Sequence, residues 1–334
     1  MRATPLLVNT VCVVSLWAAV CVVAPAQTLS TASASEGYPV RPVRLVTPFP
    51  PGGGTDILSR ALAPRLTDYL GSAVIVENRA GAGGMVGIEA VAKSAPDGYT
   101  VMLVSGSLTI LPSLFANVRY DAVKDFAPIT LATRQPYIAV VHPSLPARTF
   151  RDFLALARAR PGQITYASAG SGGAGHLGVE LLKTMVKVKL VHVPYRGAGP
   201  ALIDLLGGHV SLMFASTPSS MPHVKTGRLR ALAMTGAQPS AAMPDVQTIA
   251  ASGVPGFETY GWYGLLVPAG TPPSIITRLH ATILKAMAAP EVSERIVADG
   301  SEKVGNTPEQ FAEYIKRDIP RWAKVIKESG ARAD

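Results

Sequence analysis

The stretch Thr47-Pro-Phe-Pro-Pro-Gly-Gly-Gly-Thr-Asp-Ile-Leu-Ser-Arg60 decides the fold. An apolar run at residues 43–46 precedes it, and the glycines at 52–54 separate that run from an apolar helical pattern. The pattern predicts a strand, a tight turn and a helix with Thr55 or Asp56 at its N-cap. Free N–H groups at such a helix N-terminus, with about half a positive charge from the helix dipole, favour an anion.

A second turn of the same design lies at residues 164–176, where Gly170-Ser-Gly-Gly-Ala-Gly175 follows an apolar strand. Nicotinamide-binding folds use this G-x-G-x-x-G spacing, but they also need an acidic residue about 20 positions further on. Residues 190–193 contain no carboxylate. We therefore interpret the glycines as access to backbone N–H groups, and we expect the two turns to face each other across a small anion.

The N-terminus predicts export. Residues 11–24 are apolar apart from Ser15, and Ala24-Pro-Ala26 fits the small-x-small rule for signal cleavage. We expect residues 1–26 to be a cleavable signal peptide, with an uncleaved anchor as the alternative. Cys12 and Cys21, the two cysteines of the chain, both fall in this segment, so we expect no disulfide or thiol chemistry in the mature protein.

Composition narrows the classes of function. The formal charge is +9, but the basic residues are scattered, which argues against a nucleic-acid-binding face. A diffuse positive field would attract an acidic solute. The positive charge could equally serve only to keep the protein soluble. The six histidines show no i, i+4 pair, so the sequence predicts no zinc site and no other cofactor.

Apolar strands alternate with helical patterns along the chain. This order predicts an α/β fold with largely parallel, doubly wound sheets. Residues 135–146 and 228–236 are expected to cross between two lobes, one of residues 38–138 plus 231–334 and the other of 139–230. Ligands in such folds bind outside the carboxyl ends of the strands, where both glycine turns lie. The strand candidates are residues 43–47, 73–77, 100–104, 137–142, 163–168, 189–194, 210–214, 229–235 and 264–267.

Several polar residues near the turns allow two readings. Asp56 is either a helix cap or a group that orders ligand. Ser168 and Ser171, with His176, suggest an exported hydrolase, but the chain has no G-x-S-x-G elbow, and Ser168 more naturally donates a hydrogen bond at a strand end. Arg196 is either a clamp for a carboxylate or a rim residue.

Two aromatic residues also allow two readings. Trp262 and Tyr263 follow a turn, so they either pack in the core or line the cleft.

Taken in order, these residues resemble the Bug family of exported solute-binding receptors, which are related to the TctC component of tripartite tricarboxylate transporters. The resemblance covers nearly the whole mature chain. Its motifs are Tyr38-Pro39, Pro48-Phe-Pro-Pro-Gly-Gly-Gly-Thr-Asp56, Val76-Glu-Asn-Arg-Ala-Gly-Ala-Gly-Gly84, Tyr166-Ala-Ser-Ala-Gly170, His176-Leu177, Val193-Pro-Tyr-Arg-Gly197, Leu205-Leu-Gly-Gly208, Pro255-Gly-Phe257, Trp262-Tyr-Gly264 and Arg321-Trp-Ala-Lys-Val-Ile326.

The resemblance implies a two-lobed periplasmic-binding-protein fold of type II, the Venus flytrap, with a mainly parallel sheet flanked by helices in each lobe. It implies a receptor in the periplasm, not an enzyme, that captures a small carboxylate and delivers it to TctA- and TctB-like membrane subunits. A solute sensor without a transporter is an alternative. The candidate ligand-binding residues are Phe49, Pro51, Gly52, Gly53, Gly54, Thr55, Asp56, Ser168, Gly170, Ser171, Gly172, His176, Tyr195 and Arg196.

The chain departs from the family pattern at two places. Ser211 stands where relatives often carry an acidic residue, and Ala215-Ser216 stands where they often carry Asp-Asn. A di- or tricarboxylate, an aromatic acid and an amino acid all remain candidate ligands. If the aspartate of that Asp-Asn pair recognises an amine or hydroxyl in relatives, its absence here disfavours an amino acid and favours simpler carboxylates or aromatic acids.

Overall fold

The computed structural model describes residues 37–195, 197–239 and 243–332. Their strands form a mixed sheet in the order β2-β1-β3-β9-β4-β7-β5-β6, and β8 and β10 also pair with β4. The strands are β1 (Val43–Thr47), β2 (Val74–Asn78), β3 (Thr100–Ser105), β4 (Phe126–Val141), β5 (Thr165–Ser168), β6 (Val191–Pro194), β7 (Leu212–Ser216), β8 (Arg230–Met234), β9 (Tyr260–Pro268) and β10 (Glu302–Lys303). The helices are α1 (Gly54–Leu70), the short 3-10 helix η1 (Ala82–Gly84), α2 (Met85–Ala92), α3 (Ser107–Leu114), α4 (Phe150–Ala159), α5 (Ala174–Val186), α6 (Ala198–Leu206), α7 (Thr217–Lys225), α8 (Pro273–Ala288), α9 (Pro290–Ala298) and α10 (Pro308–Ser329).

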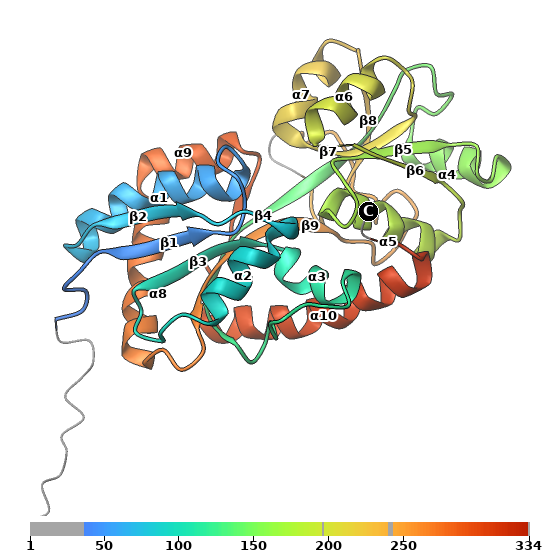
Figure 1. The fold of residues 1–334 in the computed structure, drawn as a ribbon. Helices are drawn as coiled ribbons and strands as arrows, with labels where there is room; N and C mark the ends of the chain where they lie inside the picture. The colour runs from blue at the N-terminus through green and yellow to red at the C-terminus, as the bar shows by residue number, and fades with distance from the viewer. Residues whose placement is uncertain (1–36, 196, 240–242, 333–334) are drawn as a thin grey trace, which may run out of the picture. The chain divides into compact units, whose positions relative to one another are not determined.

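Strand β4 divides the sheet into two halves (Figure 1). Its first part, residues 126–136, pairs with β9, and its second part, residues 137–141, pairs with β7 and β8. We call the half with β1, β2, β3, β9 and β10 and its helices the first lobe, and the half with β5–β8 and its helices the second lobe. This is the two-lobed α/β architecture that the sequence predicts.

The strand directions follow the path of the chain between the lobes. Strands β2, β1 and β3 are parallel, as are β6, β5 and β7. In contrast, β9 is antiparallel to β3 and β4, and β4 is antiparallel to β7 and β8. The chain leaves the first lobe along β4 and re-enters it along β9, so these strands run in opposite directions. The predicted parallel order therefore holds for the outer strands, while the centre of the sheet is antiparallel.

The sequence predicts only the second part of β4. Pro128 and Pro136 interrupt its first part, and proline lacks the N–H group that a strand ladder needs. The pairing with β9 accommodates these prolines through register shifts between Pro128 and Thr130 and between Leu131 and Thr133. Pairing with a distant strand, rather than local propensity, therefore makes this part of β4.

Helix α10 connects the two lobes. It begins with a predicted capping box, in which Thr307 and Gln310 satisfy each other's backbone N–H groups. It contacts α3 and β4 and, further along, α5 of the second lobe. Trp322 near its end packs in one apolar cluster with Ile110 of α3 and Leu177 of α5. The chain crosses between the lobes along β4, as predicted for residues 135–146, but it returns along β9 rather than at residues 228–236, which contain β8 of the second lobe. Helix α10 is a further connection that the sequence did not predict.

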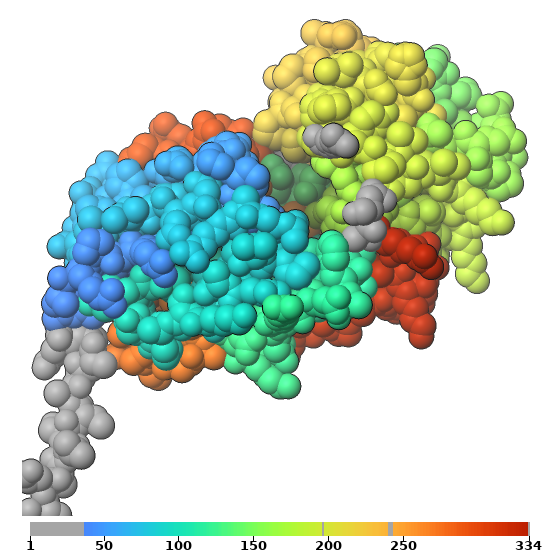
Figure 2. Space-filling model, in the orientation of Figure 1, coloured from blue at the N-terminus to red at the C-terminus, as the bar shows by residue number. Residues whose placement is uncertain are grey.

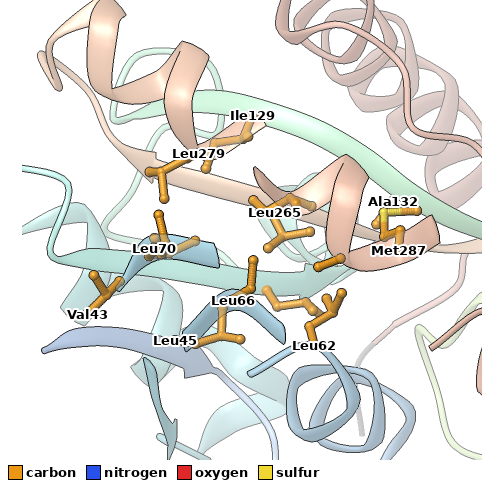
Figure 3. Packing of buried hydrophobic residues seen from close by; sticks show 14 of the residues in the cluster. Val43, Leu45, Leu62, Leu66, Leu70, Ile129, Ala132, Leu265, Leu279 and Met287 are labelled. Carbon is orange, nitrogen blue, oxygen red and sulfur yellow. The ribbon is translucent and has the colours of Figure 1, made fainter. Parts of the chain in front are cut away.

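The core of the first lobe fixes where β1 ends. Leu45 of β1 and Leu62 and Leu66 of α1 point toward Leu265 of β9 and Met287 of α8 (Figure 3). These side chains are nearly or fully buried. At about 1.5–3 kcal/mol for each large apolar side chain removed from water, this packing holds α1 firmly against the sheet. The glycine turn between β1 and α1 therefore starts and ends on rigid elements.

Candidate functional site

The first turn, residues 48–54, joins β1 to α1. Its N-cap residue, Gly53, is extended, with φ −77° and ψ 166°, and no side chain caps the helix. The prediction that Thr55 or Asp56 is the N-cap is therefore wrong, since both lie within the first turn of α1. The glycines bring the backbone so close to the sheet that a Cβ at Gly54 would overlap the Tyr263 hydroxyl of β9.

Asp56 braces the first turn from inside. Its Oδ2 accepts the Gly52 N–H at 2.9 Å, and its Oδ1 accepts hydrogen bonds from Arg60 Nε and Asn78 Nδ2, each at 3.0 Å. Burial opposes ionisation of this carboxyl group, but the hydrogen bonds from Arg60, Gly52 and Asn78 outweigh it and lower the pKa of Asp56. The carboxylate is thus occupied in holding the shape of the turn. Thr55 is also buried, and its Oγ1 accepts a hydrogen bond from Thr47 Oγ1 at 2.8 Å.

The second turn, residues 169–173, joins β5 to α5. Gly170 and Gly172 have positive φ angles of 138° and 79°, conformations that favour glycine. Gly173 is the N-cap, with φ −69° and ψ 157°, and again no side chain caps the helix. The brace here is His176, whose Nδ1 accepts the Gly172 N–H at 3.0 Å. The His176 imidazole therefore holds the shape of the second turn, as the Asp56 carboxylate holds the shape of the first.

Aromatic rings and polar groups fill the space behind the second turn. The ring of His176 stacks on that of His192, with centroids 3.9 Å apart, and His192 stacks on Tyr166 at 4.8 Å. Ser168 Oγ lies 2.7 Å from His192 Nε2 and accepts the Gly170 N–H at 3.2 Å. Ser168 is only 2% exposed, so its hydroxyl supports the turn from beneath. His176 Nε2 also lies 3.9 Å from Glu180 Oε1.

A cavity of about 440 Å³ lies between the two lobes. The space-filling view shows the surface hollowed where the blue-to-cyan residues of the first lobe face the yellow-green residues of the second (Figure 2). The volume is within the range of about 300–1,000 Å³ typical of small-molecule sites. It is lined by Phe49, Gly83, Ser105, Gly106, Ser107, Ile110, Leu111, Leu114, Phe115, Gln135, Tyr137, Ala169, Gly170, Ser171, Gly172, Gly173, Ala174, Gly261, Trp262 and Tyr263.

Two of the residues that line the cavity are tyrosines with protonated hydroxyls. Burial, with a smaller effect of the nearby Asp299 carboxylate, raises the pKa of Tyr137 to about 12. Burial also raises the pKa of Tyr263, with Asp299 and Tyr137 contributing. Both phenols therefore remain protonated near neutral pH and keep an O–H to donate.

The structure brings together only some of the predicted site residues. Phe49, Gly170, Ser171 and Gly172 line the cavity, and so do Trp262 and Tyr263. Tyr195 does not line it, because its hydroxyl donates to Asp204 Oδ2 at 2.6 Å. Arg196 lies outside the described residues. The other predicted residues that lie away from the cavity lining are Pro51, Gly52, Gly53, Gly54, Thr55, Asp56, Ser168 and His176.

The contribution of α3 to the cavity was not predicted from the sequence. Ser105, Gly106 and Ser107, at its N-terminus, line the cavity opposite the second turn, and so does one apolar face of the helix. The signal was present, because Val104-Ser-Gly-Ser107 repeats the order of strand end, small residues and helix start. Gln135 and Tyr137 were also missed, because they lie within β4 where it passes from one lobe to the other.

The described residues hold no cluster of three His, Cys, Asp or Glu side chains placed to bind a metal ion. In the same part of the chain, no helix is long and apolar enough to cross a membrane. The signal peptide expected at residues 1–26 lies outside the described residues.

Residues 58–331 match the family model described as the tripartite tricarboxylate transporter family receptor, TctC. The chain belongs to this TctC receptor family. It is 39% identical to protein BugT of Bordetella pertussis over 300 residues, which are 89% of this chain and 92% of BugT. Members of the TctC family are solute-binding receptors rather than enzymes, which removes the alternative of an exported hydrolase at Ser168 or Ser171.

Solved structures of TctC-type receptors share the fold. Rpa4515 of R. palustris, solved with adipate, has a TM-score of 0.76 and 35% identity, covering 89% of this chain and 100% of Rpa4515. MatC of Rhodopseudomonas palustris, solved with malate, has a TM-score of 0.73 and 31% identity. The match covers 86% of this chain and 100% of MatC. The periplasmic binding protein BugD has a TM-score of 0.73 and 34% identity, covering 89% and 100%. The predicted family and fold class are thus confirmed.

Proposed function

We propose that this TctC-type receptor captures a small carboxylate between its lobes in the periplasm and delivers it to membrane subunits of the TctA and TctB type. The observation that carries the proposal is the cavity between the lobes, which the second glycine turn, Tyr137 and Tyr263 line. Backbone N–H groups and phenolic O–H groups both donate to a carboxylate. The relatives solved with adipate and malate support a carboxylate as the ligand.

In this proposal the ligand carboxylate binds first to the second turn, beside Gly170, Ser171 and Gly172, with the N–H groups of Ala174 and Gly175 at the start of α5 as its donors. The first turn joins it when the lobes close, bringing Phe49 and the backbone around Gly53 to the ligand. A ligand shifts the balance between open and closed forms only by its difference in affinity for them, so donors divided between the lobes favour the closed form. The other proposed contacts are Pro51, Gly52, Gly54, Thr55, Asp56, Ser168, His176, Tyr195 and Arg196.

The proposal includes the predicted division of the chain. Residues 1–26 act as the signal peptide, residues 38–138 plus 231–334 form the first lobe, and residues 139–230 form the second, except that β8 and the described residues between it and β9 pack with the second lobe. Limited proteolysis of the exported protein, followed by mass spectrometry, checks the mature N-terminus. A mature chain that still begins at residue 1 would show that the signal peptide is not removed.

The main test is a thermal-shift screen of the purified protein with mono-, di- and tricarboxylates, followed by calorimetric titration of the hits. A ligand at about 100 times its Kd stabilises the folded state by about 2.7 kcal/mol. For a chain of this size, each kcal/mol raises Tm by roughly 2–4 °C. Matched amides of the same acids are the control, because they keep the shape and lose the charge. A panel of acids that leaves Tm unchanged contradicts the proposed function.

Transport is tested separately. We expect deletion of the receptor gene to abolish uptake of the radiolabelled ligand by cells that contain TctA- and TctB-type subunits, and re-expression to restore it. Binding by the purified protein without any loss of uptake in the deletion strain would instead favour the sensor alternative.

A further inference from the structure

One wall of the cavity is the apolar face of α3. Ile110, Leu111 and Leu114 line the cavity from this helix, and Phe115 follows directly after its end. Residues spaced by three and four lie on one side of a helix, so Ile110, Leu111 and Leu114 form a continuous strip. The strip begins where Ser107 opens the helix and runs along the cavity.

Packing on the side away from the cavity fixes the position of this wall. Ile110 belongs to the cluster that includes Trp322 of α10. Leu111 belongs to the apolar cluster of the first lobe that contains Trp262. Both side chains are buried, whereas Leu114 and Phe115 keep part of their surface exposed toward the cavity. A wall packed in this way presents the same apolar surface to each ligand rather than rearranging around it.

Leu114 places the apolar wall directly beside the proposed carboxylate anchor. A Cβ at Gly172 would overlap Cδ1 of Leu114, so the leucine side chain lies against the second turn. A ligand whose carboxylate binds at the start of α5, directly after that turn, has its next carbon atoms near Leu114. The aromatic rings of Phe49 and Trp262 also line the cavity. One side of the ligand body thus lies against hydrocarbon.

The lack of charged side chains in the described cavity lining also favours a ligand with an apolar body. Among the described residues that line the cavity there is no Asp, Glu, Lys, Arg or His. From the described lining residues, only hydroxyl and amide groups would stand opposite a second carboxylate or an ammonium group. Taking a charge out of water without an opposing charge is costly, whereas taking a methylene out of water is favourable.

We propose that this receptor selects carboxylates with an apolar body, an alkyl chain or an aromatic ring, over short polar dicarboxylates and amino acids. The inference rests on the proposed function, since it assumes that the second turn holds a carboxylate. The apolar strip of α3 is the specificity-determining element, and Leu114 is its residue nearest to the anchor. Each methylene buried against the strip lowers Kd about fourfold, which corresponds to about 0.8 kcal/mol.

The first experiment is calorimetric titration of the purified protein with acetate, butyrate, hexanoate and benzoate, and with malate, citrate and glutamate. We expect Kd to fall by about 15-fold from butyrate to hexanoate, the effect of two methylenes. We also expect hexanoate and benzoate to bind at least tenfold more tightly than malate or glutamate. If malate, citrate or glutamate binds more tightly than hexanoate and benzoate, the specificity is wrong but the proposed function stands. If no carboxylate binds, both are wrong.

The second experiment replaces the strip residue nearest to the anchor. Leu114→Asn keeps a side chain of similar size but makes it polar, so we expect at least a tenfold loss of hexanoate affinity and less than a twofold change for acetate. The matched control is Ile203→Asn on α6, because Ile203 is 68% exposed and does not line the cavity. Equal losses for acetate and hexanoate in Leu114→Asn contradict the inference. The titration series on the unmodified protein tests it even if this variant folds poorly.

Discussion

The two glycine turns share a design but differ in what holds them and in what they face. Each follows a strand, each opens a helix through an extended glycine N-cap, and neither helix has a side-chain cap. The first turn is braced by the Asp56 carboxylate, and the second by the His176 imidazole. The second turn lines the cavity with consecutive residues, whereas the first reaches it only through Phe49.

This difference shows that a glycine turn in the sequence does not by itself determine whether that turn contacts the ligand. An uncapped helix N-terminus attracts an anion wherever it lies. Its access to ligand depends on what packs around it, and Tyr263 already lies against Gly54 at the first turn. The second turn has open space in front of it and a buried aromatic stack behind it. We therefore expect substitutions at the second turn to affect binding more than those at the first.

The largest expected effect is that of Gly173→Val on binding. The nearest atom to a Cβ at this N-cap would be Gly170 O at 3.5 Å, an ordinary contact, so the fold should persist. The branched side chain would cover the N–H groups of Ala174 and Gly175, which have no intrahelical partner at the start of α5. Loss of about two charge-assisted hydrogen bonds predicts roughly a 100-fold rise in Kd for the best carboxylate. Calorimetric titration, with circular dichroism to verify the fold, measures this, and an unchanged Kd rules out the second turn as the anchor.

The next effect concerns stability at the first turn. Asp56→Ala removes the acceptor of the Gly52, Arg60 and Asn78 hydrogen bonds, and we expect a loss of about 1–3 kcal/mol at neutral pH. The folded-state pKa of Asp56 is lowered, so its contribution is present above the pKa of the unfolded chain and is lost as the pH falls through the folded-state value. The Tm difference between variant and parent should therefore shrink as the pH falls below about 4. A difference that stays constant into acid contradicts the brace.

A smaller effect is expected for Gly53→Val, the matched change at the other N-cap. A Cβ here would have Pro50 O as its nearest neighbour at 3.7 Å, so this residue too is accommodated. Because the first turn reaches the ligand only when the lobes close, we expect about a tenfold rise in Kd, near 1.4 kcal/mol. A rise in Kd as large as that of Gly173→Val would show that the two turns contribute equally to ligand binding. No loss at all would exclude the first turn from the site.

The smallest effect concerns the brace of the second turn. His176 Nδ1 accepts the Gly172 N–H, and His176→Gln keeps a side-chain acceptor, whereas His176→Ala removes it. We expect His176→Ala to raise Kd for the best carboxylate about fivefold and His176→Gln to raise it less than about twofold. Calorimetric titration of both variants measures this, and equal losses in the two variants would contradict the brace.

Much of the fold could be predicted from local sequence. The strand at residues 43–47 matches β1, and the Thr307 capping box opens α10 as predicted. In both, the residues that decide the structure are near neighbours in the chain. The first part of β4 and the bridging role of α10 could not be predicted in this way. Both depend on partners far away in the sequence, β9 for the strand and α3 and α5 for the helix.

The sequence by itself determined the family, the two glycine turns and the strands and helices that carry them, because turn chemistry and hydrophobic periodicity act over a few residues. Only the tertiary structure decided that the apolar face of α3 lies beside Gly172 and that Asp56 is a brace. It also decided that Tyr137 and Tyr263 line the cavity between the lobes. These relations join residues from separate elements, and their distances are set by long-range packing.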